Sequence, residues 1–75
     1  MDPQQQIGQR IREARLRAGL SQVAAADALG IARPTLTSIE AGRRSVRAEE
    51  LVRFAAVLRA SVYELLSDRP IDGVA

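Results

Sequence analysis

Three glycines, Gly19, Gly30 and Gly42, divide the first part of the chain into segments whose apolar residues recur at helical spacing. Glycine often lies just past the last residue of a helix, where it adopts a left-handed backbone at little steric cost. The middle segment, between Gly19 and Gly30, leaves room for only about two helical turns. The pattern therefore predicts three consecutive short helices.

The starts of the second and third helices carry their own signals. Ser21 can accept hydrogen bonds from the open N–H groups that begin the second helix. Arg33 and Pro34 open the third helix, since proline is tolerated in a first turn where its missing N–H has no partner. Leu36 and Ile39 then stand at the spacing of a buried face, so the third helix is predicted to cover residues 33–41.

The second half of the chain predicts two more helices. Residues at i, i+3, i+4 and i+7 form one apolar stripe of a fourth helix: Leu51, Phe54, Ala55 and Leu58. Its first turn contains Glu49 and Glu50, where the helix dipole favours anions. Residues 61–64 match a capping box ahead of Leu65, so a short fifth helix follows. The sequence thus predicts an all-α domain of five helices without strands.

The chain is long enough for one domain and no more. Residues 1–6 are predicted to be a flexible N-terminus, and residues 7–66 to form the domain. Helical signals fade after Leu66, where proline, glycine and aspartate recur. Residues 67–75 are therefore predicted to be a C-terminal tail or the start of a linker.

Cysteine and histidine are absent from the sequence. Their absence excludes disulfide frameworks, zinc sites of the Cys/His kind, and Cys–His or Ser–His–Asp catalysis. We expect no cofactor, no metal and no enzymatic activity. No apolar run approaches the roughly 18–20 residues of a membrane span, and residues 1–7 lack the features of a signal peptide. We therefore expect a cytoplasmic protein that does not contact a membrane.

All eleven basic residues are arginine, and they are unevenly placed. Residues 31–47 contain four arginines and one glutamate, whereas residues 48–75 contain three arginines and five acidic residues. A basic middle segment suits a surface that faces phosphates, because phosphate neutralisation supplies most non-specific DNA affinity. The alternative is a solvated arginine-rich face in a chain whose alanine and arginine content reflects base composition.

The most specific feature is the spacing of small and apolar residues between residues 21 and 41. Counted from Gln22 as the first position, Ala26 is the fifth, Gly30 the ninth, Leu36 the fifteenth and Ile39 the eighteenth. A small residue is needed where two helices cross, a glycine where the turn requires a left-handed backbone, and two aliphatic residues behind the second helix. This arrangement predicts a helix-turn-helix unit at residues 21–41, which places one helix in a DNA major groove.

Beyond this spacing, several short segments of the chain resemble the Cro/phage-repressor (XRE-type) helix-turn-helix family: Ile7-Gly8, Arg15, Gly19-Leu20-Ser21-Gln22, Gly30-Ile31 and Thr35-Leu36-Thr37-Ser38-Ile39-Glu40-Ala41-Gly42-Arg43-Arg44. The resemblance covers roughly residues 7–66. It implies a five-helix lambda-repressor-like DNA-binding domain of bacterial or phage origin. The implied function is a transcriptional regulator, more specifically a repressor, that reads double-stranded DNA with the helix at residues 33–41.

The resemblance also implies roles for particular side chains. Arg33 is expected to donate two hydrogen bonds to O6 and N7 of guanine, with a phosphate contact as the alternative. Pro34 departs from the polar residue common at its position and can offer only apolar contact. The expected base-reading residues are Arg33, Pro34, Thr35, Thr37 and Ser38. The expected phosphate contacts, which position the protein without specifying a sequence, are Ser21, Gln22, Arg43, Arg44 and Arg47.

Other positions bear on the frame of the domain. Arg15 and Glu40 resemble a family pair that ties the first helix to the reading helix, with two unpaired surface charges as the alternative. Ala32 and Arg47 stand where the family often has a capping Ser or Thr, and Arg59 where it often has glycine. We therefore expect slightly strained junctions at these three positions.

The expected assembly is a homodimer, because members of the family usually bind two half-sites about one helical turn apart. Val57, Val62, Tyr63 and the C-terminal tail are candidate dimer contacts, although these apolar residues fit a core equally well. A second interpretation makes the chain a DNA-binding or interaction module of an antitoxin. Under the same interpretation, the chain can instead be the DNA-binding module of a larger regulator with a sensor or peptidase-like domain beyond Ala75.

Overall fold

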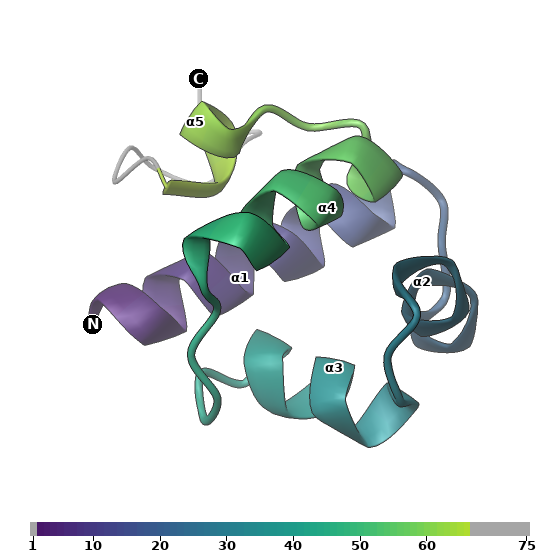
Figure 1. Cartoon of the computed structure of the whole chain (residues 1–75), viewed down its shortest axis with the longest axis horizontal. Helices are drawn as coiled ribbons and strands as arrows, with labels where there is room; N and C mark the ends of the chain where they lie inside the picture. Colours follow the sequence, from purple (N-terminus) through teal and green to yellow (C-terminus); the bar gives the residue numbers. More distant parts are fainter. Residues whose placement is uncertain (1, 67–75) are drawn as a thin grey trace.

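The computed structural model of the chain describes residues 2–66 and places five helices among them (Figure 1). They are α1 (Pro3–Arg17), α2 (Gln22–Leu29), α3 (Arg33–Glu40), α4 (Ala48–Leu58) and α5 (Val62–Leu66). No strand occurs within this range. The predicted all-α fold of five helices is therefore confirmed.

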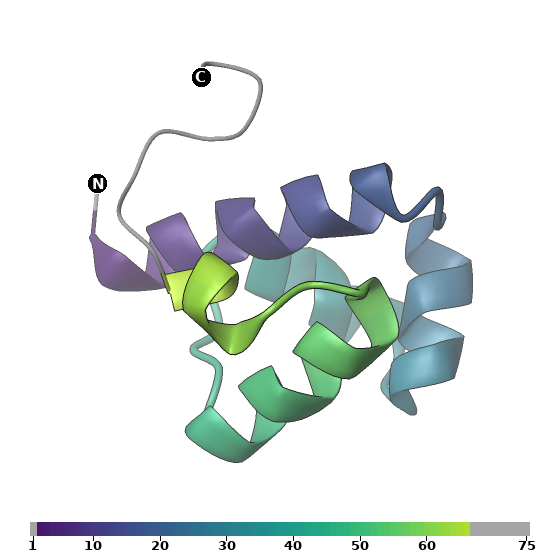
Figure 2. The same cartoon turned by 90° about the horizontal axis from the view of Figure 1, so that it is seen from above.

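The helices α1 and α4 each contact three others: α1 packs on α3, α4 and α5, and α4 packs on α1, α2 and α5. α3 and α5 lie on opposite sides of the pair formed by α1 and α4 (Figure 1). α2 packs on α3 and α4 and closes the end of the molecule beside the last turn of α1 (Figure 2). The largest fully buried side chains come from all five helices: Ile11, Leu29, Leu36, Ile39, Phe54 and Leu65. These side chains belong to one continuous core, and α3 lies at an edge of the molecule (Figure 1).

The first helix begins earlier than the sequence reasoning placed it. α1 starts at Pro3, and the Asp2 carboxylate accepts a hydrogen bond from the backbone N–H of Gln5 at 2.8 Å. Residues 3–6, which were expected to be a flexible N-terminus, therefore form its first turn. An acidic cap followed by proline is itself a local signal for the start of a helix. The predicted tail at residues 67–75 lies outside the described residues.

Two of the predicted helix starts have their expected caps. Ser21 Oγ accepts the backbone N–H of Ala24 at 3.0 Å and so caps α2. At α5, Ser61 and Glu64 each accept the other's backbone N–H, at 2.9 and 2.8 Å. Gly30 ends α2 with φ 73°, the left-handed conformation that the turn was predicted to need. These local signals are confirmed.

The expected strain is found at Arg59, whereas Ala32 and Arg47 have ordinary extended backbones with φ −73° and −80°. Neither Ala32 at the start of α3 nor Arg47 at the start of α4 provides a side-chain cap. Arg59 ends α4 with φ 56° and is the one residue other than glycine with a positive φ between residues 2 and 66. A left-handed backbone costs an L-residue about 1–2 kcal/mol, so strain is present at this junction.

The N-terminal half of α1 fits closely against the C-terminal end of α3. A Cβ at Gly8 would overlap the carbonyl oxygen of Ile39 and lie 2.9 Å from that of Glu40. Gln4 Nε2 donates to the carbonyl oxygen of Gly42 at 2.8 Å, just beyond α3. The backbone at the end of α3 is therefore in close contact with Gly8 and is joined to α1 by the Gln4 side chain. None of the described helices is both long and apolar enough to cross a membrane.

Candidate nucleic-acid interface

The five residues expected to read bases all lie on α3, and they differ in exposure. Arg33 and Pro34, in the first turn, are exposed, whereas Thr35, Thr37 and Ser38 are partly buried. Leu36 and Ile39 are fully buried behind them, as the helix-turn-helix spacing predicted. α3 packs on α1 and α2 with this apolar side. The start of α3 is thus the most accessible part of the helix.

Behind α3, Arg15 and Glu40 form a buried ion pair between α1 and α3. Arg15 Nε lies 2.6 Å from Glu40 Oε2, and Nη2 lies 3.2 Å from Oε1, so the contact is bidentate. The remaining terminal nitrogen, Nη1, donates to the carbonyl oxygen of Leu20 at 2.9 Å. Only 7% of Arg15 and 8% of Glu40 is exposed, so the alternative of two surface charges is wrong. The guanidinium therefore connects α1, the turn before α2 and the end of α3.

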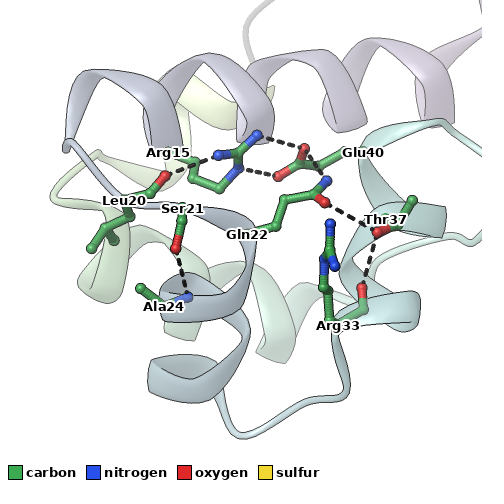
Figure 3. Close-up of polar contacts among 8 residues, drawn as sticks. All are labelled: Arg15, Leu20, Ser21, Gln22, Ala24, Arg33, Thr37 and Glu40. Atoms are coloured by element: carbon green, nitrogen blue, oxygen red, sulfur yellow. Dashed lines mark hydrogen bonds and ion pairs between the residues drawn. The ribbon is translucent and has the colours of Figure 1, made fainter.

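Gln22, the first residue of α2, extends this pair into a network (Figure 3). Its Nε2 donates to Glu40 Oε1 at 3.2 Å, and its Oε1 accepts from the Thr37 hydroxyl at 3.4 Å. The same hydroxyl lies 3.1 Å from the carbonyl oxygen of Arg33, and its single proton serves one acceptor at a time. The network Arg15–Glu40–Gln22–Thr37 thus joins α1, α2 and α3.

Gln22 was expected to contact a phosphate, and its hydrogen bond to Glu40 was not predicted. Thr37 and Glu40 are three residues apart on α3, so they share one side of that helix. That spacing, together with a glutamine at the start of α2, was the available signal. Thr37 is consequently both a predicted base-reading residue and a member of the network behind the helix.

Arg33 extends from the first turn of α3 toward Gln22 and Thr37 (Figure 3). Within the part of the chain that the structure describes, its side chain makes no hydrogen bond or ion pair. A guanidinium carries five N–H donors in a planar fork. Its donors therefore remain available to an acceptor outside the protein.

The three arginines expected to contact phosphates after α3 are all exposed, but they are not equivalent. Arg44 donates from Nη2 to Glu50 Oε2 at 3.3 Å and from Nη1 to the carbonyl oxygen of Ser45 at 3.2 Å. Among residues 2–66, the side chains of Arg43 and Arg47 make no hydrogen bond or ion pair. The sequence did not reveal that Arg44 is already engaged by an acidic residue six positions later.

Glu50 is fixed at the start of α4. Its Oε1 accepts the backbone N–H of Arg47 at 2.9 Å, which supplies half of a capping box. This backbone hydrogen bond, followed by the contact with the Arg44 guanidinium, lowers the pKa of the Glu50 carboxyl from its ordinary value of 4.5. Glu50 is therefore ionised at neutral pH.

The chain belongs to the helix-turn-helix domain family, whose model matches residues 6–66. Its structural neighbours place it with the Cro/phage-repressor type of that family, in agreement with the resemblance of its sequence. It is accordingly a member of a family of DNA-binding transcription regulators. No curated protein sequence matches it.

Three solved structures illustrate the likeness. The restriction-modification controller protein C.AhdI from Aeromonas hydrophila is 34% identical with a TM-score of 0.75, over 81% of this chain and 92% of that one. SinR, the master regulator for biofilm formation, was solved in complex with DNA and is 37% identical with a TM-score of 0.75, over 81% and 98%. The DNA-binding domain of the P22 C2 repressor is 26% identical with a TM-score of 0.75, over 93% and 96%.

Proposed function

We propose that this protein is a sequence-specific repressor that inserts α3 into the major groove of double-stranded DNA. The proposal is carried by the position of Arg33 at the exposed start of α3, where its guanidinium makes no hydrogen bond or ion pair with the described residues. The opposite side of α3 is joined to α1 and α2 by the buried network. The SinR complex shows a related domain with DNA bound. Occupying a promoter in this way needs no cofactor and no chemistry, and we place the protein in the cytoplasm.

Base reading is assigned to the first and middle turns of α3. Arg33 can donate two hydrogen bonds to O6 and N7 of one guanine, a contact worth about 1–3 kcal/mol of discrimination. Thr35 and Ser38 can donate, accept or offer apolar contact to neighbouring bases. Pro34 can contribute only apolar contact. We therefore expect one strongly specified guanine with weaker preferences beside it.

Phosphate contacts are assigned to residues on both sides of α3. Gln22 Nε2 carries two protons, and Glu40 accepts one of them, so the second can be donated to a phosphate. Ser21 is exposed beside it, and its hydroxyl proton can be donated while its oxygen caps α2. After α3, Arg43, Arg44 and Arg47 provide exposed cations. Such contacts fix the register of α3 on the duplex without reading its sequence.

We further propose that the protein binds as a homodimer on two half-sites about one helical turn apart. A single small domain that reads a few base pairs binds weakly, which favours pairing. Of the candidate contact residues, Tyr63 is 68% exposed, whereas Val57 and Val62 are partly buried against the core. Tyr63 is therefore the better candidate for a dimer contact.

The proposal is tested by fluorescence-anisotropy titration of labelled duplexes with wild type, Arg33→Ala and Arg43→Ala across a salt series. The duplexes are a randomised pool and the sequence that wild type selects from it. Arg33→Ala should reduce the preference for the selected duplex about 5- to 150-fold. Arg43→Ala should weaken binding to both duplexes equally and lower the salt slope by about 1.

The contrasting results are equally clear. If Arg33→Ala retains the full preference for the selected duplex, α3 is not the reading element. If wild type binds the selected duplex and the pool equally at all salt concentrations, the protein is not a sequence-specific regulator.

A further inference from the structure

We propose that Glu50 is an intramolecular competitor for DNA at Arg44. Its carboxylate occupies the guanidinium that a phosphate would bind, and so it weakens the affinity of the protein for every duplex. The inference rests on the proposed function, since it assumes that the loop after α3 faces the DNA backbone. Glu50 is therefore a positioning residue, which affects DNA binding by holding the Arg44 guanidinium.

The Arg44 guanidinium is turned toward its own chain at both terminal nitrogens. Nη2 lies 3.3 Å from Glu50 Oε2, and Nη1 lies 3.2 Å from the carbonyl oxygen of Ser45. Its side chain is nevertheless 43% exposed, so a phosphate can approach it from solvent. A phosphate that takes the Nη2 proton now donated to Glu50 must displace that carboxylate, and a phosphate at the remaining N–H groups lies close to its negative charge.

Glu50 cannot move away as easily as Arg44. Its side chain is only 25% exposed, and Oε1 accepts the N–H of Arg47 at 2.9 Å. Arg47 provides no side-chain cap for α4, so withdrawal of Glu50 would leave that helix start without its one side-chain partner. The negative charge of Glu50 stays fixed beside the basic segment while Arg44 turns toward DNA.

The neighbouring Glu49 shows what Glu50 adds beyond charge alone. Both residues lie in the first turn of α4, but Glu49 is exposed and has no ion pair or side-chain hydrogen bond among the described residues. Replacing either glutamate by glutamine removes one negative charge from the same turn. Only the Glu50 replacement also releases Arg44.

Glu50→Gln is a suitable variant because it separates the ion pair from the helix cap. The glutamine oxygen can still accept the N–H of Arg47, since glutamine serves as well as glutamate in a capping box. Its other polar atom becomes an amide nitrogen, which cannot accept from Arg44. The start of α4 is thereby kept while the competing anion is lost.

The experiment measures affinity for two duplexes, one of random sequence and the selected one. The single variants are Glu50→Gln, Glu49→Gln and Arg44→Ala. The two Gln substitutions are also each combined with Arg44→Ala. Glu50→Gln should tighten binding about two- to fivefold more than Glu49→Gln, the range expected for release of an exposed ion pair. The gain should be the same for both duplexes, because phosphate contacts carry no sequence information. In the Arg44→Ala background the two Gln variants should be equal.

Three results would overturn the inference. Glu50→Gln and Glu49→Gln could bind alike, the extra gain could persist without Arg44, or Glu50→Gln could bind more weakly than wild type. The last would mean that the carboxylate holds Arg44 ready for DNA. If none of the variants nor wild type binds either duplex, the proposed function itself fails, and the inference fails with it.

Discussion

The two ends of α3 differ in how many interactions they make with the rest of the protein. At the C-terminal end, Glu40 is buried in a bidentate ion pair and also accepts from Gln22. At the N-terminal end, Ala32 provides no cap, and Arg33 and Pro34 are exposed. The contrast shows how one helix of eight residues is held rigidly from behind while its leading turn stays available to a partner.

The largest loss of stability is expected from Glu40→Gln, which breaks the ion pair at the C-terminal end of α3. The variant leaves Arg15 as a buried cation without its counterion, which costs about 3–5 kcal/mol of unfolding free energy. Urea denaturation followed by circular dichroism measures the loss. Glu49→Gln, the same change on an exposed carboxylate, should lie within about 0.5 kcal/mol of wild type. Equal stability of the two variants would show that the pair does not hold α3.

A smaller loss is expected from Gly8→Ala, which tests the contact of α1 with the same end of α3. The added methyl group would meet the backbone carbonyl oxygens of Ile39 and Glu40, which cannot rotate away as a side chain can. Forcing extra volume into such a contact costs about 1–3 kcal/mol. Thermal unfolding should show this loss for Gly8→Ala but not for Gln9→Ala, an exposed neighbour in α1. A stabilised Gly8→Ala would mean that the helices are not in close contact.

A substitution at the N-terminal end of α3 should instead raise the stability of the protein. Ala32→Ser supplies the missing cap of α3 and should raise the unfolding free energy by about 1 kcal/mol. Ala28→Ser, at an exposed position inside α2, should instead lower it by less than about 0.7 kcal/mol. Parallel urea titrations without DNA compare the two. If Ala32→Ser gives no gain, the start of α3 is not limited by its cap.

The smallest effect concerns the loop that follows α3. The pKa of Glu50 is lowered chiefly by the backbone N–H of Arg47, so its contribution to stability is complete above its ordinary value of 4.5. That contribution is lost as the pH falls through the lower value in the folded protein. The difference in melting temperature between wild type and Glu50→Gln should therefore be constant from about pH 6 to 8 and shrink in acid. A difference that grows in acid would contradict this account.

Much of the architecture is encoded in local signals that can be read from the sequence. Ser21, Gly30 and the pair of Ser61 and Glu64 mark helix ends through their own backbone geometry, and the structure places helix ends there. The burial of Leu36 and Ile39 follows from helical periodicity. Features of this kind depend on residues close together in the chain, so spacing alone is enough to find them.

The features that sequence reasoning missed depend on how helices meet. Gln22 and Glu40 come from α2 and α3, and their contact follows from the packing of these two helices on each other. The pairing of Arg44 with Glu50 depends on the path of the loop between α3 and α4. The early start of α1 is different, because Asp2 and Pro3 are a local signal that the sequence does contain.

The most direct test of the account is a selection of binding sites from randomised duplexes with wild type, Arg33→Ala and Arg43→Ala, followed by sequencing. Wild type should select a site with one fixed guanine per half-site. With Arg33→Ala that position should become degenerate while neighbouring preferences persist, and with Arg43→Ala the site should be unchanged. If Arg33→Ala selects the same site as wild type, with the guanine still fixed, the exposed start of α3 does not read DNA.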